Sequence, residues 1–170
     1  MARDSVQKDL PTLYRAFAIA TRAHPELRLL HVGLGQMEPL IRELGISDRV
    51  VRVEYLADTT PFYQACDALG MSSLFEGHSI AVLEALSSGL PLILSDAPGN
   101  RGFFKLGLSH IWNAPVKDVA RFAEAIVQWI EDRPAHRPSN HREIAVREFS
   151  PESCYGRILE LYQRLANQPR

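Results

Sequence analysis

Short apolar runs alternate along the chain with segments in which apolar residues recur every three or four positions. Five runs have the length and composition of buried strands, and they cover residues 27–32, 50–55, 68–72, 91–95 and 109–113. The intervening segments and those after the last run predict helices. This alternation is typical of an α/β domain with a parallel sheet and helices on both faces.

Several predicted helices begin at a residue whose side-chain oxygen can accept a hydrogen bond from the first-turn N–H groups. These candidates are Asp9, Thr60, Asp118 and Ser150. Two helical segments also carry an apolar stripe. After Asp118 the stripe consists of Val119, Phe122, Ile126 and Ile130, and after a polar connection over residues 131–140 the last helix carries Tyr155, Ile158, Leu159, Tyr162 and Leu165.

The length of 170 residues fits one domain over residues 1–170, with a core over 3–130 and C-terminal helices over 139–166. The 46% hydrophobic and 23% charged residues are typical of a globular protein. A net charge of −1 gives no general attraction for nucleic acid, so we expect no nucleic-acid partner.

The two cysteines, Cys66 and Cys154, have no metal-ligand spacing and fit reduced thiols in a cytoplasmic protein. The sequence contains no apolar stretch of roughly 20 residues, so no transmembrane segment is predicted. No metal ligand set is predicted either.

The most informative segment covers residues 72–95 and reads SSLFEGHSIAVLEALSSGLPLILS. It predicts a strand end, a loop, a helix, a turn and the next strand. Ligands of open parallel sheets bind beyond the carboxyl ends of the strands, where this loop would lie. Gly77 lets the backbone approach a ligand, and Ser79 can cap a helix whose first N–H groups point at the same place. The segment therefore predicts a phosphate site.

Two acids bracket this loop and helix, Glu76 and, eight residues later, Glu84. Carboxylates accept hydrogen bonds from sugar hydroxyls, so the pair could hold a sugar and a ribose beside the phosphate site. The spacing alone also fits a second interpretation, in which Glu76 stabilises the positive end of the helix and Glu84 is a solvated helix residue.

The whole segment resembles the Glu-x7-Glu signature of glycosyltransferase family 4, also called group 1. The matching pieces are Glu76-Gly77, Leu83-Glu84-Ala85, Gly89-Leu90-Pro91 and Ser95-Asp96. Upstream, the strand ending His31-Val32-Gly33-Leu34-Gly35 and the step Ala65-Cys66-Asp67-Ala68 are similar to the family's. The resemblance covers residues 3–130 and the closing helix, and it implies a Rossmann-like lobe, the C-terminal, donor-binding half of a GT-B fold.

The resemblance also implies roles for particular residues. Arg3 and Lys8 reproduce the family's spacing of two cations at the donor diphosphate, where they offset phosphate charge as the leaving group departs. Glu76 would contact the transferred sugar and Glu84 the ribose. The remaining donor-binding positions are the backbone of Gly77, His78, Ser79 and Ile80 at the phosphates, and the strand ends at Gly33, Gly35 and Tyr55.

The activity that the resemblance implies is retaining hexosyl transfer from a nucleoside diphosphate sugar to an acceptor hydroxyl, in glycan biosynthesis, without metal or cofactor. The acceptor would be a glycan or a lipid-linked molecule held by an N-terminal lobe. That lobe is absent from this sequence, so we expect the chain to bind donor but to be inactive alone. We expect a cytoplasmic location, at the membrane surface through the other lobe.

The sequence departs from the family pattern at several places, of which two bear on the loop and on the sheet. The family often has Phe-Gly after its first Glu-Gly, whereas this chain has His78-Ser79. The family's lobe also opens with an apolar strand, and only Met1 and Ala2 precede Arg3 here. We therefore expect a central strand to be missing, either because the sequence is a piece of a longer chain or because another chain supplies it.

Two other functions stay open. Gly33-Leu34-Gly35 after a strand suggests a dinucleotide-dependent oxidoreductase, but Glu38 occupies the third glycine position of that fingerprint. A scaffold module that keeps the fold without the chemistry is the second alternative.

Overall fold

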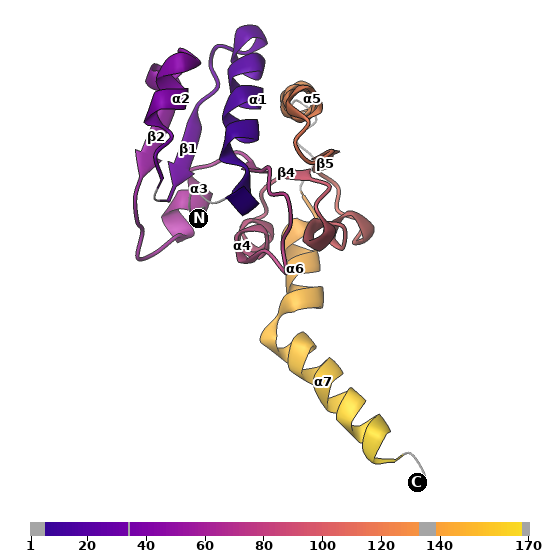
Figure 1. The fold of residues 1–170 in the computed structure, drawn as a ribbon. Helices are drawn as coiled ribbons and strands as arrows, with labels where there is room; N and C mark the ends of the chain where they lie inside the picture. The colour runs from indigo at the N-terminus through magenta and orange to yellow at the C-terminus, as the bar shows by residue number, and fades with distance from the viewer. Residues whose placement is uncertain (1–5, 34, 133–138, 168–170) are drawn as a thin grey trace.

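A computed structural model describes residues 6–33, 35–132 and 139–167 (Figure 1). Each of the five predicted strands is confirmed in position, with bounds that differ by no more than two residues. The strands are β1 (Leu29–Val32), β2 (Val50–Val53), β3 (Leu69–Met71), β4 (Leu92–Ser95) and β5 (Ile111–Ala114). The chain therefore has the predicted α/β architecture.

Helices fill the segments between the strands and follow the last one. The α-helices are α1 (Leu10–Ala23), α2 (Glu38–Glu43), α3 (Thr60–Gln64), α4 (Ile80–Ser87), α5 (Val119–Asp132), α6 (His141–Phe149) and α7 (Pro151–Ala166). Short 3-10 helices are η1 (Val6–Lys8), η2 (Ser47–Arg49), η3 (Pro98–Asn100) and η4 (Phe103–Lys105). None of the helices in the described ranges is long and apolar enough to cross a membrane.

The strands form two separate parallel sheets. One contains β1 and β2, with Leu29 opposite Val50, and the other has the order β3-β4-β5, with Met71 opposite Leu94. Within the described residues no strand lies between β1 and β3. The sheet is thus divided at the place where the sequence predicts a missing central strand.

Helices cover both faces of the larger sheet, and its central strand β4 is therefore buried on both sides. Leu92 and Leu94 pack into a cluster with residues of α4 and α6, while Ile93 points the other way into a cluster with α1 and α5. The predicted stripe of α5 belongs to this second cluster, where Phe122 and Ile126 are buried. A third cluster joins α1 to α2 and to the small sheet. Helix α1 therefore packs against both sheets.

The C-terminal helix α7 extends away from the rest of the structure and packs mainly on α6 (Figure 1). Its predicted apolar stripe is present, but every member of it is exposed, and no residue of α7 is buried. The pattern thus correctly predicts an amphipathic helix, whose apolar side faces solvent in this structure.

The predicted helix caps are confirmed at two positions. Asp118 accepts a hydrogen bond from the N–H of Arg121, and Ser150 accepts one from the N–H of Ser153. At α3 the prediction is wrong, because Thr60 is the first helical residue and its N–H donates to the Asp58 carboxylate instead.

The cap predictions for Asp9 and Ser79 are also wrong about the side chain. Asp9 adopts a left-handed conformation with φ 44°, and its carboxylate accepts from the Thr12 hydroxyl rather than from a backbone N–H. Ser79 occupies the N-cap position of α4, but its hydroxyl donates to the sulfur of Met71.

The start of α6 is attached to the larger sheet by a fully buried histidine, His141. Its Nε2 accepts from the N–H of His110 at 3.2 Å, which places the ring proton on Nδ1 and lets it donate to the Leu90 carbonyl at 2.7 Å. Burial lowers the pKa of His141 below its ordinary value, and the bond to Leu90 only partly offsets this effect. The ring is therefore neutral in the folded protein.

We expect His141 to make folding less favourable in acid. In the unfolded chain its pKa is about 6.5, whereas in the folded chain it is lower, so the unfolded state binds more protons once the pH falls through that value. Its contribution to the free energy of unfolding is thus complete above about pH 6.5 and declines below it by at most about 1.4 kcal/mol per pH unit.

Urea unfolding at pH 7.5, 6.5, 5.5 and 5.0 checks this expectation. His141→Gln keeps a donor and an acceptor but cannot titrate, so its stability should fall less steeply between pH 6.5 and 5.0 than that of wild type. His24→Gln, outside this network, controls for the loss of a histidine. Equal slopes for wild type and His141→Gln would contradict the assignment.

Candidate functional site

The site predicted from residues 72–95 forms where the chain leaves β3. Four hydrogen bonds attach this stretch to the segment before α1. The N–H of Leu74 donates to the Gln7 carbonyl at 2.8 Å and the Gln7 amide donates to the Phe75 carbonyl at 3.1 Å. The Ser72 hydroxyl bonds the carbonyls of Lys8 at 3.1 Å and Asp9 at 2.8 Å. These bonds fix η1 beside the loop.

This attachment brings together two of the predicted residues, Lys8 and Glu76. Their side chains form an ion pair with Nζ 2.7 Å from Oε1, across 68 positions of sequence. The Glu76 side chain is only 6% exposed and that of Lys8 20%. Since an unpaired charge this buried costs several kcal/mol, Lys8 neutralises Glu76 in the unliganded protein. The pair places a cation and a carboxylate at one point of the loop.

The N-terminus of α4 opens beside this pair. Gly77, His78 and Ile80 are exposed, and the hydrogen bonds of the described residues use none of the backbone N–H groups from Gly77 to Ile80. Free N–H groups and the positive end of the helix dipole attract an anion. Ser79 is buried and its hydroxyl donates to the sulfur of Met71, so the turn into α4 is attached to the end of β3.

The loop after β4 supports Glu76 from a second side, because Gly99 packs directly against the backbone of Glu76. A Cβ added to Gly99 would lie 2.5 Å from the Glu76 carbonyl carbon, so only glycine fits there. Fully buried Asn100 holds the loop by donating to the Ser95 carbonyl at 3.0 Å. The Ser95 hydroxyl in turn bonds the Ser73 carbonyl. These contacts connect the ends of β3 and β4 to each other and hold the loop that carries Glu76.

Glu84 lies one turn further along α4, on the same side of the helix as Ile80. Its Oε2 accepts from the Tyr63 hydroxyl of α3 at 2.9 Å. Burial and the Glu84 carboxylate together raise the pKa of Tyr63, so the phenol stays protonated and donates. This bond orients Glu84 and leaves its other oxygen available to a ligand.

His78 packs as an aromatic side chain in this structure. Its ring centroid lies 5.4 Å from that of Phe103, in a stacked arrangement, and 5.4 Å from that of Phe149 in a tilted one. The ring therefore joins the loop to η4 and α6. The resemblance implies a contact between donor and the His78 backbone, and these ring contacts give the side chain a packing role.

The other predicted donor-binding residues follow β1 and β2 in the chain. Gly33 follows β1 with φ 148° and donates its N–H to the Val53 carbonyl at 2.9 Å, and the Gly35 carbonyl accepts from Arg52 at 2.8 Å. Tyr55 follows β2 and is 73% exposed. These three positions follow strands of the small sheet, whereas Glu76 follows β3 of the larger sheet, Glu84 lies in α4 and Lys8 lies in η1. Arg3 lies outside the described residues.

Sequence reasoning missed three supporting residues, Tyr63, Gly99 and Asn100. Tyr63 gives no local signal, because its partner Glu84 is 21 positions away. The run Pro98-Gly99-Asn100 does signal a turn, but not its contact with Glu76. In the described part of the chain, no group of three or more His, Cys, Asp or Glu side chains could hold a metal ion.

Comparison with known proteins places this geometry in context. A family model described as "Glycosyl transferases group 1" matches residues 1–146. The lipopolysaccharide core biosynthesis glycosyltransferase LpsE of Rhizobium meliloti (strain 1021) is 30% identical over an alignment of 175 residues, which covers 99% of this chain and 49% of LpsE. The UDP-Gal:alpha-D-GlcNAc-diphosphoundecaprenol alpha-1,3-galactosyltransferase of Escherichia coli is 28% identical over 121 residues, 71% of this chain and 31% of that enzyme.

Solved structures show the same fold. HepE of Anabaena, crystallised with UDP-glucose, matches with a TM-score of 0.83 at 23% identity, over 96% of this chain and 47% of HepE. The pneumococcal O-GlcNAc transferase GtfA, crystallised with UDP and GlcNAc, matches with a TM-score of 0.77 at 23% identity, over 98% of this chain and 35% of GtfA. The chain spans about half the length of LpsE and HepE. The expected fold, the C-terminal lobe of a GT-B fold, is confirmed.

The contact between Gly99 and Glu76 generates a test of how the loop is held. Gly99→Ala should lower the free energy of unfolding by about 1–3 kcal/mol, because the new Cβ overlaps the Glu76 backbone and the loop must move. Gly102→Ala is the matched control: its Cβ would meet no atom within 4 Å, so stability should change by no more than about 0.5 kcal/mol. Chemical denaturation measures both. Equal stability of the two variants would show that the Glu76 loop moves away freely.

Proposed function

This chain belongs to the group 1 glycosyl transferases, and on that premise we propose that the loop over residues 76–80 holds the diphosphate and sugar of a nucleoside diphosphate sugar. The single observation that supports this most is the Lys8–Glu76 ion pair beside the open N-terminus of α4. A diphosphate can accept from the N–H groups of residues 77–80 and from Lys8 together. The sugar hydroxyls then donate to Glu76, which Lys8 otherwise neutralises.

The ribose of the nucleoside lies on one side of this loop and the base on the other. Glu84 accepts from the ribose hydroxyls through the carboxylate oxygen that Tyr63 leaves available. The base lies toward the small sheet, against the backbone at Gly33 and Gly35 and against Tyr55. HepE was crystallised with UDP-glucose and GtfA with UDP, and these complexes support uridine as the base to test first.

The proposed reaction is retaining transfer of a hexose to an acceptor hydroxyl. The bond between the anomeric carbon and the diphosphate oxygen breaks, the acceptor oxygen forms the new bond to that carbon, and the acceptor's proton leaves with the diphosphate. Lys8 and the N-terminus of α4 stabilise the charge that grows on the leaving oxygens. We propose that Arg3 adds a second cation there, and that neither a metal ion nor a cofactor takes part.

The acceptor contacts are proposed for an N-terminal lobe. A glycan or lipid-linked acceptor would bind there, at a cytoplasmic membrane surface, in glycan biosynthesis. Without that lobe the chain brings no acceptor to the sugar, so we propose that the 170-residue chain binds donor but does not transfer it. The divided sheet favours one alternative, a scaffold module that keeps the fold without catalysis.

Calorimetric titration with UDP, GDP, ADP and UDP-glucose tests the donor site. We expect UDP and UDP-glucose to bind best, and Lys8→Met to weaken the preferred nucleotide by at least tenfold, because one phosphate contact is lost. Lys8→Met also leaves Glu76 unpaired, so the double variant Lys8→Met/Glu76→Gln, which removes both charges, separates lost phosphate binding from lost stability. Arg22→Met, at the opposite end of α1, controls for the loss of one cation. Binding unchanged in the double variant would refute the site.

A separate experiment tests the role of Glu84. It removes the ribose hydroxyls from the nucleotide instead of the carboxylate from the protein. The wild-type chain should bind UDP severalfold more tightly than 2′,3′-dideoxy-UDP, because the missing hydroxyls cannot donate to Glu84. Glu84→Gln should bind both with more similar affinity. Calorimetry measures the ratio, and a ratio that Glu84→Gln leaves unchanged would place the ribose elsewhere.

The reaction itself requires a protein that contains both lobes. In such a protein, NMR of the product's anomeric proton should show the configuration of the donor, and EDTA should not reduce the rate. The 170-residue chain should give no product under the same conditions. An inverted product would overturn the retaining assignment, and turnover by the chain alone would overturn the proposed need for the second lobe.

A further inference from the structure

Asp9 stands alone between two helical segments, and its backbone is left-handed. Because η1 ends at Lys8 and α1 begins at Leu10, the chain must change direction at this one residue. Asp9 does so with φ 44° and ψ 48°, a conformation that residues other than glycine adopt at a cost. Strained backbone of this kind persists where the surrounding structure holds it, and it occurs most often at functional sites. The strain here lies directly beside the cation of the proposed site.

Two hydroxyl groups hold this left-handed turn. The hydroxyl of Ser72, a fully buried residue, bonds the Asp9 carbonyl at 2.8 Å and the Lys8 carbonyl at 3.1 Å. From the other side the Thr12 hydroxyl donates to the Asp9 carboxylate at 2.7 Å, and the Thr12 N–H donates to the Asp9 carbonyl at 3.1 Å. Aspartate tolerates left-handed backbone better than most residues, because its short polar side chain bonds locally. The turn is therefore bonded both from the end of β3 and from α1.

The stretch after β3 that holds this turn also carries the partner of Lys8. Ser72 bonds the Lys8 carbonyl, and the N–H of Leu74 donates to the carbonyl just before it at 2.8 Å. Glu76 accepts from Nζ of Lys8 at 2.7 Å. The backbone and the ammonium of Lys8 are thus fixed against residues 72–76 at the same time.

Helix α1, on the other side of the turn, is fixed by the core. Leu10 and Tyr14 are buried in the cluster that joins α1 to α2 and to the small sheet. Further along, Ala16 and Ala20 are buried in the cluster with α5. Because α1 is held in this way, the angle at Asp9 determines where η1 lies.

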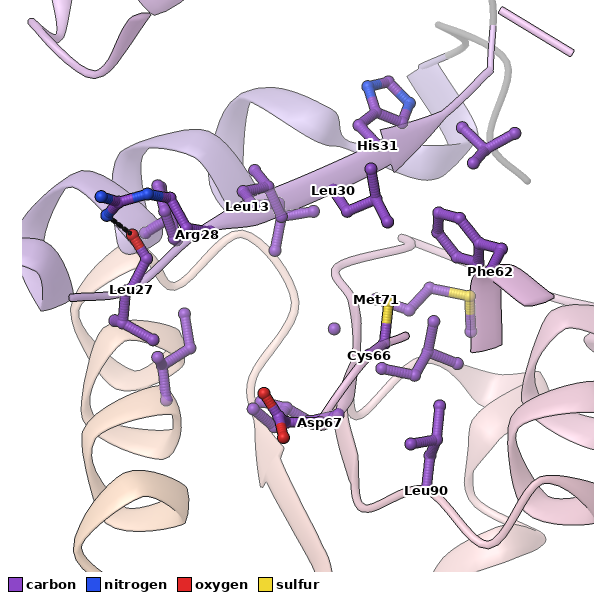
Figure 2. A pocket seen from close by; sticks show the side chains of 18 of the residues that line it. Leu13, Leu27, Arg28, Leu30, His31, Phe62, Cys66, Asp67, Met71 and Leu90 are labelled. Atoms are coloured by element: carbon purple, nitrogen blue, oxygen red, sulfur yellow. Dashed lines mark hydrogen bonds between the residues drawn. The ribbon is translucent and has the colours of Figure 1, made fainter. Parts of the chain in front are cut away.

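Packing does not hold Lys8 on every side. Lys8 lines a cavity of about 500 Å³ together with Leu13 of α1 and residues of β1 and β3. Figure 2 shows Leu30 and Phe62 on opposite sides of this space. Where Lys8 borders the cavity, no side chain packs against it. Hydrogen bonds to the turn must therefore keep Lys8 in place.

We infer that Asp9 is a positioning residue for Lys8. Its left-handed backbone sets the angle at which η1 leaves α1, and the bonds from Ser72 fix that angle, so the Lys8 ammonium reaches Glu76. Asp9 acts through its backbone, so Asp9→Gly and Asp9→Asn keep the turn, whereas Asp9→Val opposes it. The benefit to a bound diphosphate rests on the proposed function, but the placement of Lys8 does not.

Amine labelling tests the placement of Lys8 without any nucleotide. The sequence contains three lysines, of which Lys105 and Lys117 are exposed, so mass spectrometry after brief acetylation measures the rate at each. Lys8 should react about tenfold more slowly than the other two, because freeing its ammonium breaks a partly buried ion pair. Asp9→Val should remove most of this protection, whereas Asp9→Gly and Asp9→Asn should keep it. Circular dichroism checks that each variant is folded.

Either of two labelling results would overturn the inference. Folded Asp9→Val that labels at Lys8 as slowly as wild type would show that the turn does not place this lysine. Loss of protection in Asp9→Gly as large as in Asp9→Val would assign the effect to the carboxylate instead of the backbone. Ser72→Ala removes the bonds to the turn and should raise Lys8 labelling severalfold, whereas Ser87→Ala, at an exposed position of α4, should not.

Calorimetric titration with UDP and UMP connects this placement to the proposed function. The two nucleotides differ only in the second phosphate, so the ratio of their affinities reports the contact of that phosphate. Wild type should prefer UDP severalfold, Asp9→Val should bring the ratio near one, and Asp9→Gly should restore it. If wild type binds UDP and UMP equally, the proposed diphosphate contact fails, while the labelling still decides the role of Asp9.

Discussion

The pairing of β3 with β4 is the constraint on which the candidate site depends. Because Met71 lies opposite Leu94, both strands end at the same edge, and the loops that follow them meet there. The Ser95 hydroxyl bonds the Ser73 carbonyl, and Gly99 packs on the Glu76 backbone. A slip of the register would separate these loops, since the bond from Ser95 and the packing of Gly99 both meet backbone atoms of the loop after β3. The geometry of the carboxylate therefore follows from the sheet rather than from the loop's own sequence.

Without a ligand, the loop is stabilised by the ion pair between Lys8 and Glu76. Glu76 is almost completely buried, and its charge is tolerated because Lys8 lies 2.7 Å away. The same lysine is the cation that an incoming diphosphate needs. A donor must therefore share Lys8 with Glu76, and sugar hydroxyls that donate to Glu76 make up for what the carboxylate loses. This exchange favours a ligand that carries both phosphate and hydroxyl groups over a bare anion.

Much of the fold could be predicted from the sequence because local patterns determine it. Apolar runs located all five strands, and a short polar side chain correctly marked the starts of α5 and α7. Prediction was wrong where a neighbour competed: the N–H of Thr60 donates to Asp58, and the hydroxyl of Ser79 donates to the sulfur of Met71. Lys8 and Glu76 are 68 positions apart, and no local sequence pattern predicts a contact between such residues. Only the family resemblance assigned both of them to one site. Neither local patterns nor the family resemblance predicted the contact between Tyr63 and Glu84.

The divided sheet connects the site to the rest of the lobe. The positions proposed for the base belong to β1 and β2, whereas those proposed for the diphosphate and ribose depend on β3 and β4, and α1 packs against both sheets. A nucleotide that contacts both sheets must therefore hold them at one separation, and α1 is the element whose packing against both sheets sets that separation.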